Sequence, residues 1–419
     1  MKLNGTATHR RQLRIAIIGG GLAGAAAAGV FSRLPNVQVT LYEQSKCDRE
    51  IGAMIGVMVG GVKCLSRMLS PAGFEELQRI LYRGENVDGI RHRHWRTGEI
   101  MAGANSPHTP RHMQEGRTGR IALHSLLMSE IPEGTVKYGK QGVCSEAVGD
   151  GTMRVHFADG SSEDADLVVA ADGLYSKIRK QYIPDDKYVY KGRVSYSYNI
   201  PIEMVRHIKG LPTHSSAWHG NNDVVFLSRL RHKLTSFAPL KDWDPILDQV
   251  LQLLPGISAY PLQVTAWMEN PTRDNALAFV GDAAHPTGGA YGSGCSFAFA
   301  DVQALFLSLH RTYGYNADED CSKPLYNVSY ALHLYRETRM PFIKRVESQL
   351  GNDKLDATYV ATACDEKEWI RRWKKKFTIN WWILEHDVDA KWQEVEAEER
   401  HTWHRKNKED GNMTDVFGY

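Results

Sequence analysis

The sequence has few cysteines, and none is placed to bind a metal or to exchange disulfides. The six cysteines among the 419 residues form no CxxC pair, and no Cys/His spacing matches a zinc site. We therefore expect no metal site, and thiols that are free and mostly buried, as in a cytoplasmic protein.

An excess of either charge is also missing. The 51 Lys and Arg residues nearly balance the 49 Asp and Glu residues, which leaves a formal net charge of +2. A dedicated nucleic-acid-binding protein would concentrate basic residues on one face, so we expect no nucleic-acid partner.

Hydrophobic runs long enough to cross a membrane are absent as well. The nearest candidate is the segment 15–31, which follows basic residues as in a signal peptide but contains five glycines. Because a span requires about 20 mainly apolar residues, we expect no stable membrane association.

The glycines of this segment fit a nucleotide-binding turn instead. Residues 13–18 are typical of a strand buried in a parallel sheet, and Gly19, Gly21 and Gly24 follow in GxGxxG spacing. The first glycine permits the tight turn, the second lets the backbone approach a pyrophosphate, and the third lets the helix lie close to the strand.

The next segment supplies the carboxylate that such a turn requires. A second predicted strand, 37–42, ends on Glu43, about 20 residues after the last glycine, which is the usual spacing of a ribose-binding acid. The sequence therefore predicts a dinucleotide site.

Two later segments also combine a buried strand with a turn. Residues 166–171 lead into an Asp-Gly turn at Asp172, and residues 276–280 lead into a Gly-Asp turn at Asp282. A glycine-rich stretch then precedes a helix that we expect to begin near Ser296. Such a stretch lets a flat ring approach the backbone, and the helix N-terminus offers free amides to an anion.

In this order, the three segments resemble the fingerprints of the class A FAD-dependent aromatic monooxygenases, the family of salicylate hydroxylase and para-hydroxybenzoate hydroxylase. The resemblance extends from about residue 13 to about residue 309. It implies non-covalent FAD, NAD(P)H as a transient electron donor, and molecular oxygen. The implied reaction is hydroxylation of a small aromatic substrate, phenolic, salicylate-like or polyketide-derived, through a C4a-hydroperoxyflavin.

The resemblance also implies which residues contact the cofactor. Glu43 would hold the adenosine ribose and Asp282 the ribityl chain, while Arg49 and Arg120 match family arginines beside the cofactor. The turn at Asp172 would serve FAD and, transiently, NAD(P)H. The full set is Gly19, Gly21, Leu22, Ala23, Gly24, Glu43, Arg49, Ala53, Arg120, Asp172, Gly173, Gly281, Asp282, Gly292, Ser293, Gly294, Cys295 and Ser296.

The implied fold class is α/β, with a Rossmann-like FAD-binding domain interleaved with a mostly antiparallel substrate sheet and followed by C-terminal helices. We expect FAD-binding parts at 12–89, 111–182 and 274–345, a substrate-sheet hairpin at 90–110, the substrate domain at 183–273 and a helical tail at 346–419.

Alternating segments in the substrate domain predict its strands. Candidate catalytic or substrate-binding residues are Tyr196, Tyr198, His219, Arg193, Phe226 and Tyr291. Packing within the sheet explains the two strand tyrosines equally well, and we expect His219 to be an exposed turn residue. A histidine could deprotonate a phenol, but the sequence assigns no catalytic residue.

Four positions depart from the family pattern. Gly289 replaces a proline beside the flavin ring, Ser293 a glutamine, Ser296 an asparagine, and Ser197 an arginine that binds substrate in members that dearomatise phenols. Because the flanking glycines are kept, we expect FAD binding to persist while the substrate ring is held differently.

The tail is rich in tryptophan, with six of the ten after residue 365. Trp369 and Trp373 lie four residues apart, on one face of a predicted helix, and we expect this face to pack against the body of the protein.

Two alternatives to a monooxygenase remain: an oxidase or reductase on the same fold, and a non-catalytic flavin-binding redox protein. A disulfide reductase would carry a second nucleotide fingerprint and a CxxxxC motif, and the sequence has neither. For the oligomeric state we expect a monomer or a homodimer.

Overall fold

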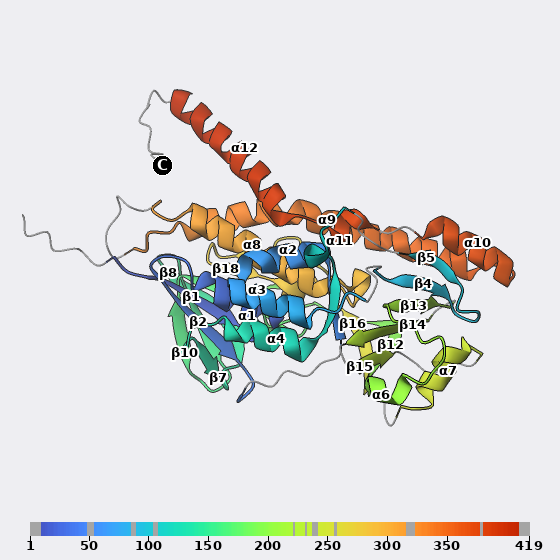
Figure 1. The fold of residues 1–419 in the computed structure, drawn as a ribbon. Coiled ribbons are helices and arrows are strands. Elements are labelled where there is room, and N and C mark those ends of the chain that lie inside the picture. Colours follow the sequence, from blue (N-terminus) through green and yellow to red (C-terminus); the bar gives the residue numbers. More distant parts are fainter. Residues whose placement is uncertain are drawn as a thin grey trace, which may run out of the picture.

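The computed structural model describes residues 10–47, 54–84, 89–103, 108–220, 223–230, 233–236, 242–254, 258–315, 323–377 and 380–409. A parallel sheet and a larger mixed sheet lie side by side, and long helices run along both (Figure 1). The α/β class with an interleaved, mostly antiparallel sheet is confirmed.

The parallel sheet is built around the first predicted strand. In order across the sheet, its strands are β17 (Thr272–Arg273), β18 (Leu277–Phe279), β11 (Leu167–Ala170), β1 (Leu13–Ile18), β2 (Val37–Glu43) and β7 (Val136–Tyr138). All neighbours pair in parallel except β17 with β18. The apolar runs predicted as buried strands form the centre of this sheet.

Both faces of the parallel sheet are covered, which explains why its strands read as continuous apolar runs. One face packs against α1 (Leu22–Phe31) and other helices, and the opposite face packs against a small antiparallel sheet and α5 (Lys177–Tyr182). The other helices are α2 (Val59–Met68), α3 (Pro71–Ile80), α4 (Arg120–Ser129) and α8 (Gly294–Arg311). The small sheet consists of β8 (Gly142–Gly149), β9 (Thr152–Phe157) and β10 (Ser162–Ala165).

The larger sheet contains the predicted hairpin and the predicted substrate strands. Its order is β16 (Ser258–Val264), β12 (Val189–Pro201), β15 (Lys233–Ser236), β14 (Val224–Leu230), β13 (Ser216–His219), β4 (Arg91–His94) and β5 (Ile100–Gly103). Its pairings are antiparallel apart from β4 with β13. Short helices α6 (Ile202–Val205) and α7 (Pro245–Leu251) cover one face around the buried Trp218.

A short ladder of β3 (Met54–Val57) and β6 (Gly116–Gly119) lies between the two large sheets. The 3-10 helix η1 (Arg111–Met113) precedes β6, and two others, η2 (Gly281–Ala283) and η3 (Ala290–Gly292), precede α8. The ladder contacts β14 of the larger sheet as well as α8 and η3. Segments from four distant parts of the chain meet at this junction.

The tail packs against the body, as predicted. It consists of α9 (Val328–Ala361), α10 (Glu366–Lys376), α11 (Trp381–Leu384) and α12 (Val388–Glu409). Trp369 and Trp373 are buried and pack against Met101 and Ala102 of β5, so α10 covers the hairpin (Figure 1). By contrast, α12 projects away from the rest of the molecule in that view.

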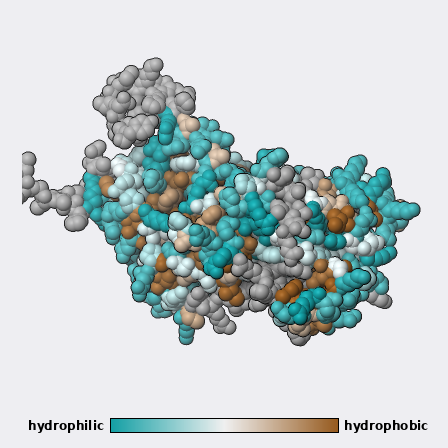
Figure 2. Space-filling model, in the orientation of Figure 1, coloured by the Kyte–Doolittle hydropathy of each residue, from teal (hydrophilic) through white to brown (hydrophobic). Residues whose placement is uncertain are grey.

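None of the helices in the described ranges has the length and apolar character that a membrane crossing requires. The face shown in Figure 2 is largely hydrophilic, with hydrophobic side chains in separate patches.

The expectation that the thiols are mostly buried is wrong. Of the cysteines in the described ranges, all free, Cys64 is buried, Cys144 and Cys295 are half-buried, and Cys47 and Cys364 are exposed. Cys47 and Cys364 lie in surface turns rather than in strand interiors. Within the described part of the chain, no cluster of His, Cys, Asp or Glu could hold a metal ion.

Candidate active site

A cavity of about 1150 Å³ extends from the parallel sheet to the junction between the two large sheets. Its lining includes the residues that directly follow four parallel strands or end them: Gly19 after β1, Glu43 of β2, Asp172 after β11 and Asp282 after β18. In open α/β sheets this carboxyl edge is where ligands bind.

Most of the predicted cofactor residues line this cavity. They are Gly19, Gly21, Leu22, Ala23, Glu43, Arg120, Asp172, Gly173, Asp282, Gly292, Gly294 and Cys295. Four other predicted positions, Gly24, Gly281, Ser293 and Ser296, are described but do not line it. Arg49 and Ala53 lie outside the described residues.

The glycine turn has the close contacts that its spacing predicts. Gly19 has φ of 101°, and a Cβ atom there would lie 2.6 Å from the carbonyl oxygen of Ala171. A Cβ atom on Gly24 would lie 1.9 Å from the carbonyl oxygen of Gly19. By contrast, a Cβ atom on Gly21 would meet nothing closer than an Arg120 nitrogen at 3.8 Å, so a phosphate can approach the backbone there.

Two side chains fix this turn from opposite sides. Glu43 accepts hydrogen bonds from the backbone amides of Gly20 and Ser45, both at 2.7 Å. The Nε2 atom of His124 donates to the carbonyl oxygen of Gly20, also at 2.7 Å. Sequence reasoning missed His124, although its position one helical turn after Arg120 places both side chains on one face of α4.

The loop before α8 holds a strained residue at the other end of the cavity. Tyr291 has φ of 55°, which a non-glycine residue rarely adopts. Its hydroxyl donates to Asp353 of α9, and Asp353 also accepts from Gln349 at 2.7 Å. Anchoring by α9 therefore compensates for strain of about 1–3 kcal/mol in a loop that lines the cavity.

The positions that depart from the family pattern at this loop make local contacts. Ser293 donates to the carbonyl oxygen of Tyr291 at 3.1 Å, and the Ser296 hydroxyl accepts from the amide of Met58 at 3.0 Å. A Cβ atom on Gly289 would meet nothing within 4 Å. The predicted helix begins at Gly294, slightly before the expected Ser296, so its free amides open onto the cavity.

Two aspartates lie beyond the last parallel strand: Asp282, whose side chain is exposed to the cavity, and Asp301, which is buried. Burial raises the pKa of Asp282, which lines the cavity, while His285 and Arg120 oppose this shift. Asp301 is fully buried and accepts from the Gly281 amide at 2.8 Å, from His285 at 2.6 Å and from Arg339 at 2.8 Å. Burial alone would raise the pKa of Asp301, but these partners hold it below its ordinary value.

Of the six candidate catalytic or substrate-binding residues, the structure brings Phe226 and Tyr291 to the cavity. Tyr196, on β12, and His219, on β13, are described but do not line it. The side chains of Arg193 and Tyr198, and that of Ser197 between them, lie outside the described residues.

The expectation that His219 is an exposed turn residue is wrong. It ends strand β13, and its Nε2 atom lies 2.8 Å from Nδ1 of His92 on β4. The rings of Trp373 and Phe377 in the tail cover this pair, with centroids 5.1 and 6.4 Å from His219. Contacts from a helix about 150 residues further along the chain are not visible in the local sequence.

This histidine pair is expected to make stability depend on pH. Burial lowers the pKa of His92 to about 3 and that of His219 to about 4. Unfolded imidazoles titrate near pH 6.5, so at lower pH the unfolded chain binds protons that the folded chain does not. The stabilisation is therefore complete above pH 6.5 and is lost as the pH falls, by about 1.4 kcal/mol per pH unit for each histidine.

Urea unfolding between pH 7 and pH 5 measures this dependence. The variant His219→Gln should reduce the slope of unfolding free energy against pH, because one of the two coupled groups no longer titrates. An unchanged slope would contradict the assignment.

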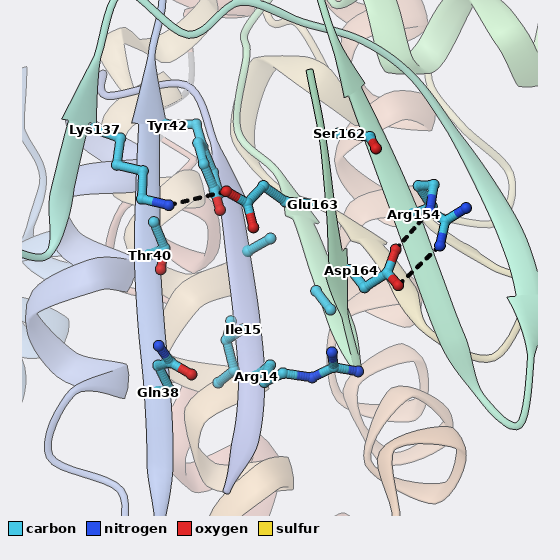
Figure 3. Close-up of a pocket in the computed structure, with 12 residues that line it drawn as sticks. Arg14, Ile15, Gln38, Thr40, Tyr42, Lys137, Arg154, Ser162, Glu163 and Asp164 are labelled. Atoms are coloured by element: carbon cyan, nitrogen blue, oxygen red, sulfur yellow. Dashed lines mark hydrogen bonds and ion pairs between the residues drawn. The ribbon is translucent and has the colours of Figure 1, made fainter.

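A second cavity, of about 460 Å³, lies between the parallel sheet and the small sheet (Figure 3). Two ion pairs lie within its lining, Arg154 with Asp164 at 2.7 Å and Lys137 with Glu163 at 3.0 Å. It lies beside the middle of β1 and β2, away from the carboxyl ends that line the larger cavity. We therefore place the active site in the larger cavity.

Comparisons with known proteins identify FAD-dependent enzymes that are similar to the chain. The chain is 25% identical over 372 residues to a 6-hydroxynicotinate 3-monooxygenase of Bordetella bronchiseptica, covering 80% of this chain and 89% of the relative. It is 28% identical to the FAD-dependent monooxygenase eupB of a Phoma species, covering 73% and 78%. A salicylate hydroxylase substrate complex superposes with a TM-score of 0.72 at 18% identity, covering 92% and 98%. No protein-family model matches the chain.

The glycine turn, the acid that ends β2, the open loop before α8 and the free amides of α8 fit FAD along one continuous cavity. The chain is similar in sequence to FAD-dependent monooxygenases and shares the fold of a salicylate hydroxylase.

Proposed function

We propose that the chain hydroxylates a small aromatic substrate, phenolic in character, with FAD, NAD(P)H and molecular oxygen. One observation carries the proposal: the cavity that begins at the glycine turn continues without interruption to an apolar compartment at the larger sheet. Ile55, Phe226, Pro261 and Leu262 line this compartment. A flat ring bound there would lie beside the cofactor and against apolar side chains.

The protein residues would bind and orient the reactants. Glu43 and the glycine turn would hold the adenosine end of FAD, and Asp282 and the first amides of α8 would hold its ring end. Bound FAD, when reduced by NAD(P)H, would supply the chemistry that activates molecular oxygen. The larger sheet would exclude water from the ring, which protects the oxidising equivalent from unproductive decay.

The activities for which similar proteins are named support this substrate class. The relatives include enzymes named for 6-hydroxynicotinate, 3-amino-4-hydroxybenzoate and 6-methylsalicylate, all of them hydroxylated or aminated aromatic acids. We also propose that NAD(P)H docks only transiently, because the sequence has a single GxGxxG fingerprint in strand–helix context.

The proposed setting is a cytoplasmic enzyme that acts as a monomer or a homodimer, without nucleic-acid or membrane partners. A formal net charge of +2 supports this proposal.

A substrate panel tests the proposed function. The purified protein with bound FAD is mixed with NADH or NADPH in air, with and without 6-hydroxynicotinate, salicylate or 3-amino-4-hydroxybenzoate. We expect at least one aromatic to raise the rate of NAD(P)H oxidation by about tenfold or more and to yield a hydroxylated product, as substrate-gated monooxygenation requires. Bound FAD without stimulation by any aromatic of the panel would contradict the proposal.

A further inference from the structure

One arginine at the junction of the two large sheets, Arg117, is held by backbone hydrogen bonds on both sides. Arg117 lies in β6, which pairs with Gly56 of β3. On its other side, its amide donates to the carbonyl of Tyr82 at 2.8 Å, and its carbonyl accepts from the amide of Tyr82 at 2.7 Å. The position of its Cα atom is therefore fixed by strand β3 on one side and by the bridge to Tyr82 on the other.

The side chain of Arg117 is buried, and the carboxylate of Glu115, which raises the pKa of Arg117 against the effect of burial, forms no ion pair with it. Arg117 is 6% exposed, and its Nη1 atom donates to the carbonyl oxygen of Gly116 at 3.1 Å. Its guanidinium lies 5.7 Å from the ring centroid of Phe226. No carboxylate in the described part of the chain forms an ion pair with it.

Two other buried arginines each form an ion pair, whereas Arg117 forms none with the residues that the structure describes. Arg179 pairs with Asp186 at 2.7 Å, and Arg339 pairs with Asp301 at 2.8 Å. A guanidinium stays protonated even when burial lowers its pKa, as it does for Arg117. Burying such a charge unpaired costs several kcal/mol, so an anion that reaches it gains an unusually strong interaction.

The surroundings of Arg117 place it at the substrate end of the cavity. It lines the cavity together with Phe226, Gly56 and Cys295. A Cβ atom on Gly56 would lie 3.1 Å from the Arg117 guanidinium, and the Cys295 thiol donates to the Gly56 carbonyl at 3.0 Å. Burial raises the pKa of Cys295 to about 11, so its thiol is neutral and supplies no countercharge.

We propose that Arg117 binds a negatively charged group on the aromatic substrate, a carboxylate or a phenolate, and so makes the enzyme selective for anionic rings. The inference rests on the proposed function and deepens it by naming the substrate class. Phe226 would contact the face of the ring while Arg117 fixes the orientation of its charged edge.

The proposed anion site is tested without turnover by binding aromatic ligands to the FAD-loaded protein. Binding is measured from the change that the ligand causes in the flavin absorbance. The carboxylate pair is benzoate with its neutral counterpart benzamide, and the phenolate pair is 4-nitrophenolate with nitrobenzene. The variants are Arg117→Met and Arg117→Lys. Arg93→Met is the matched control, because Arg93 lies over Trp218 and does not line the cavity.

We expect the unmodified protein to bind at least one of the two anions about 10–100-fold more tightly than its neutral counterpart, as a charged hydrogen bond allows. Arg117→Met should lose this preference with little change for the neutral ligand, Arg117→Lys should keep part of it, and Arg93→Met all of it. The pair that shows the preference identifies the carboxylate or the phenolate.

Three results would overturn the inference: no anion binds in preference to its neutral counterpart, Arg117→Met keeps the preference, or Arg117→Met loses FAD. The last result would make Arg117 a cofactor residue. The proposed function fails separately. If Arg117 confers anion preference but the protein carries out no NAD(P)H-dependent hydroxylation, the anion site is supported and the proposed function is wrong. If the protein hydroxylates an aromatic equally well with and without Arg117, the proposed function is supported and the anion site is wrong.

Discussion

The variant Gly24→Ala is expected to lose most of its affinity for FAD. The added Cβ atom would lie 1.9 Å from the carbonyl oxygen of Gly19, so α1 must move away from the turn that it holds against the sheet. Overpacking of this kind costs about 1–3 kcal/mol, which corresponds to about 10–100-fold in affinity if the bound geometry carries the cost. Equilibrium dialysis of the apoprotein with FAD measures the effect.

Gly29→Ala is the matched control for this prediction. It makes the same chemical change in the same helix, but the new Cβ atom would lie 3.5 Å from Glu130, an ordinary contact. Alanine also favours a helix interior over glycine by about 1 kcal/mol. Equal FAD affinity in Gly24→Ala and Gly29→Ala would show that the turn does not hold the cofactor.

Asp301→Ala is expected to cause the largest loss of stability. The carboxylate is fully buried and joins the Gly281 amide, His285 and Arg339. Its removal leaves the buried guanidinium of Arg339 without a countercharge, which costs about 3–5 kcal/mol. Chemical denaturation followed by circular dichroism measures the change in unfolding free energy.

An exposed ion pair provides the comparison for Asp301. Asp356 on α9 pairs with Lys376 at 2.8 Å, and both side chains are about 40% exposed. Asp356→Ala should therefore change the unfolding free energy by no more than about 1 kcal/mol. A loss for Asp301→Ala as small as that for Asp356→Ala would contradict the central role of the buried network.

The parallel sheet and the glycine turn could be predicted because their signals are local. The run that became β1 is apolar apart from Arg14, and that of β2 alternates apolar and polar residues. The GxGxxG spacing between them has a steric reason that the contacts of Gly19 and Gly24 bear out. The segments around Asp172 and Asp282 could be aligned with the same edge of the sheet because each directly follows a buried strand.

The features that the sequence did not reveal depend on contacts between distant segments. Arg117 is one of many arginines until β14 brings Phe226 over it and β3 brings Gly56 beside it. The local sequence predicted a turn at His219 because the helix that covers this residue follows much later in the chain. The substrate end of the cavity depends on contacts between such distant segments, whereas each segment of the cofactor end carries a local motif of its own.

The departures at the loop before α8 now have a partial structural explanation. Ser296 takes a hydrogen bond from Met58, and Ser293 bonds to the strained Tyr291, which α9 anchors through Asp353. The loop therefore keeps polar contacts of its own. Gly289 has φ of 84°, a left-handed conformation that glycine adopts without strain and that proline cannot reach.

The fate of molecular oxygen tests the central claim most directly. The FAD-loaded protein is supplied with NAD(P)H and the aromatic that best stimulates its oxidation, under oxygen labelled with the heavy isotope, and the product is analysed by mass spectrometry. A class A monooxygenase inserts one labelled atom into the ring for each product molecule formed. Unlabelled product, or hydrogen peroxide with an unchanged aromatic, would contradict the account and identify an oxidase or reductase on the same fold.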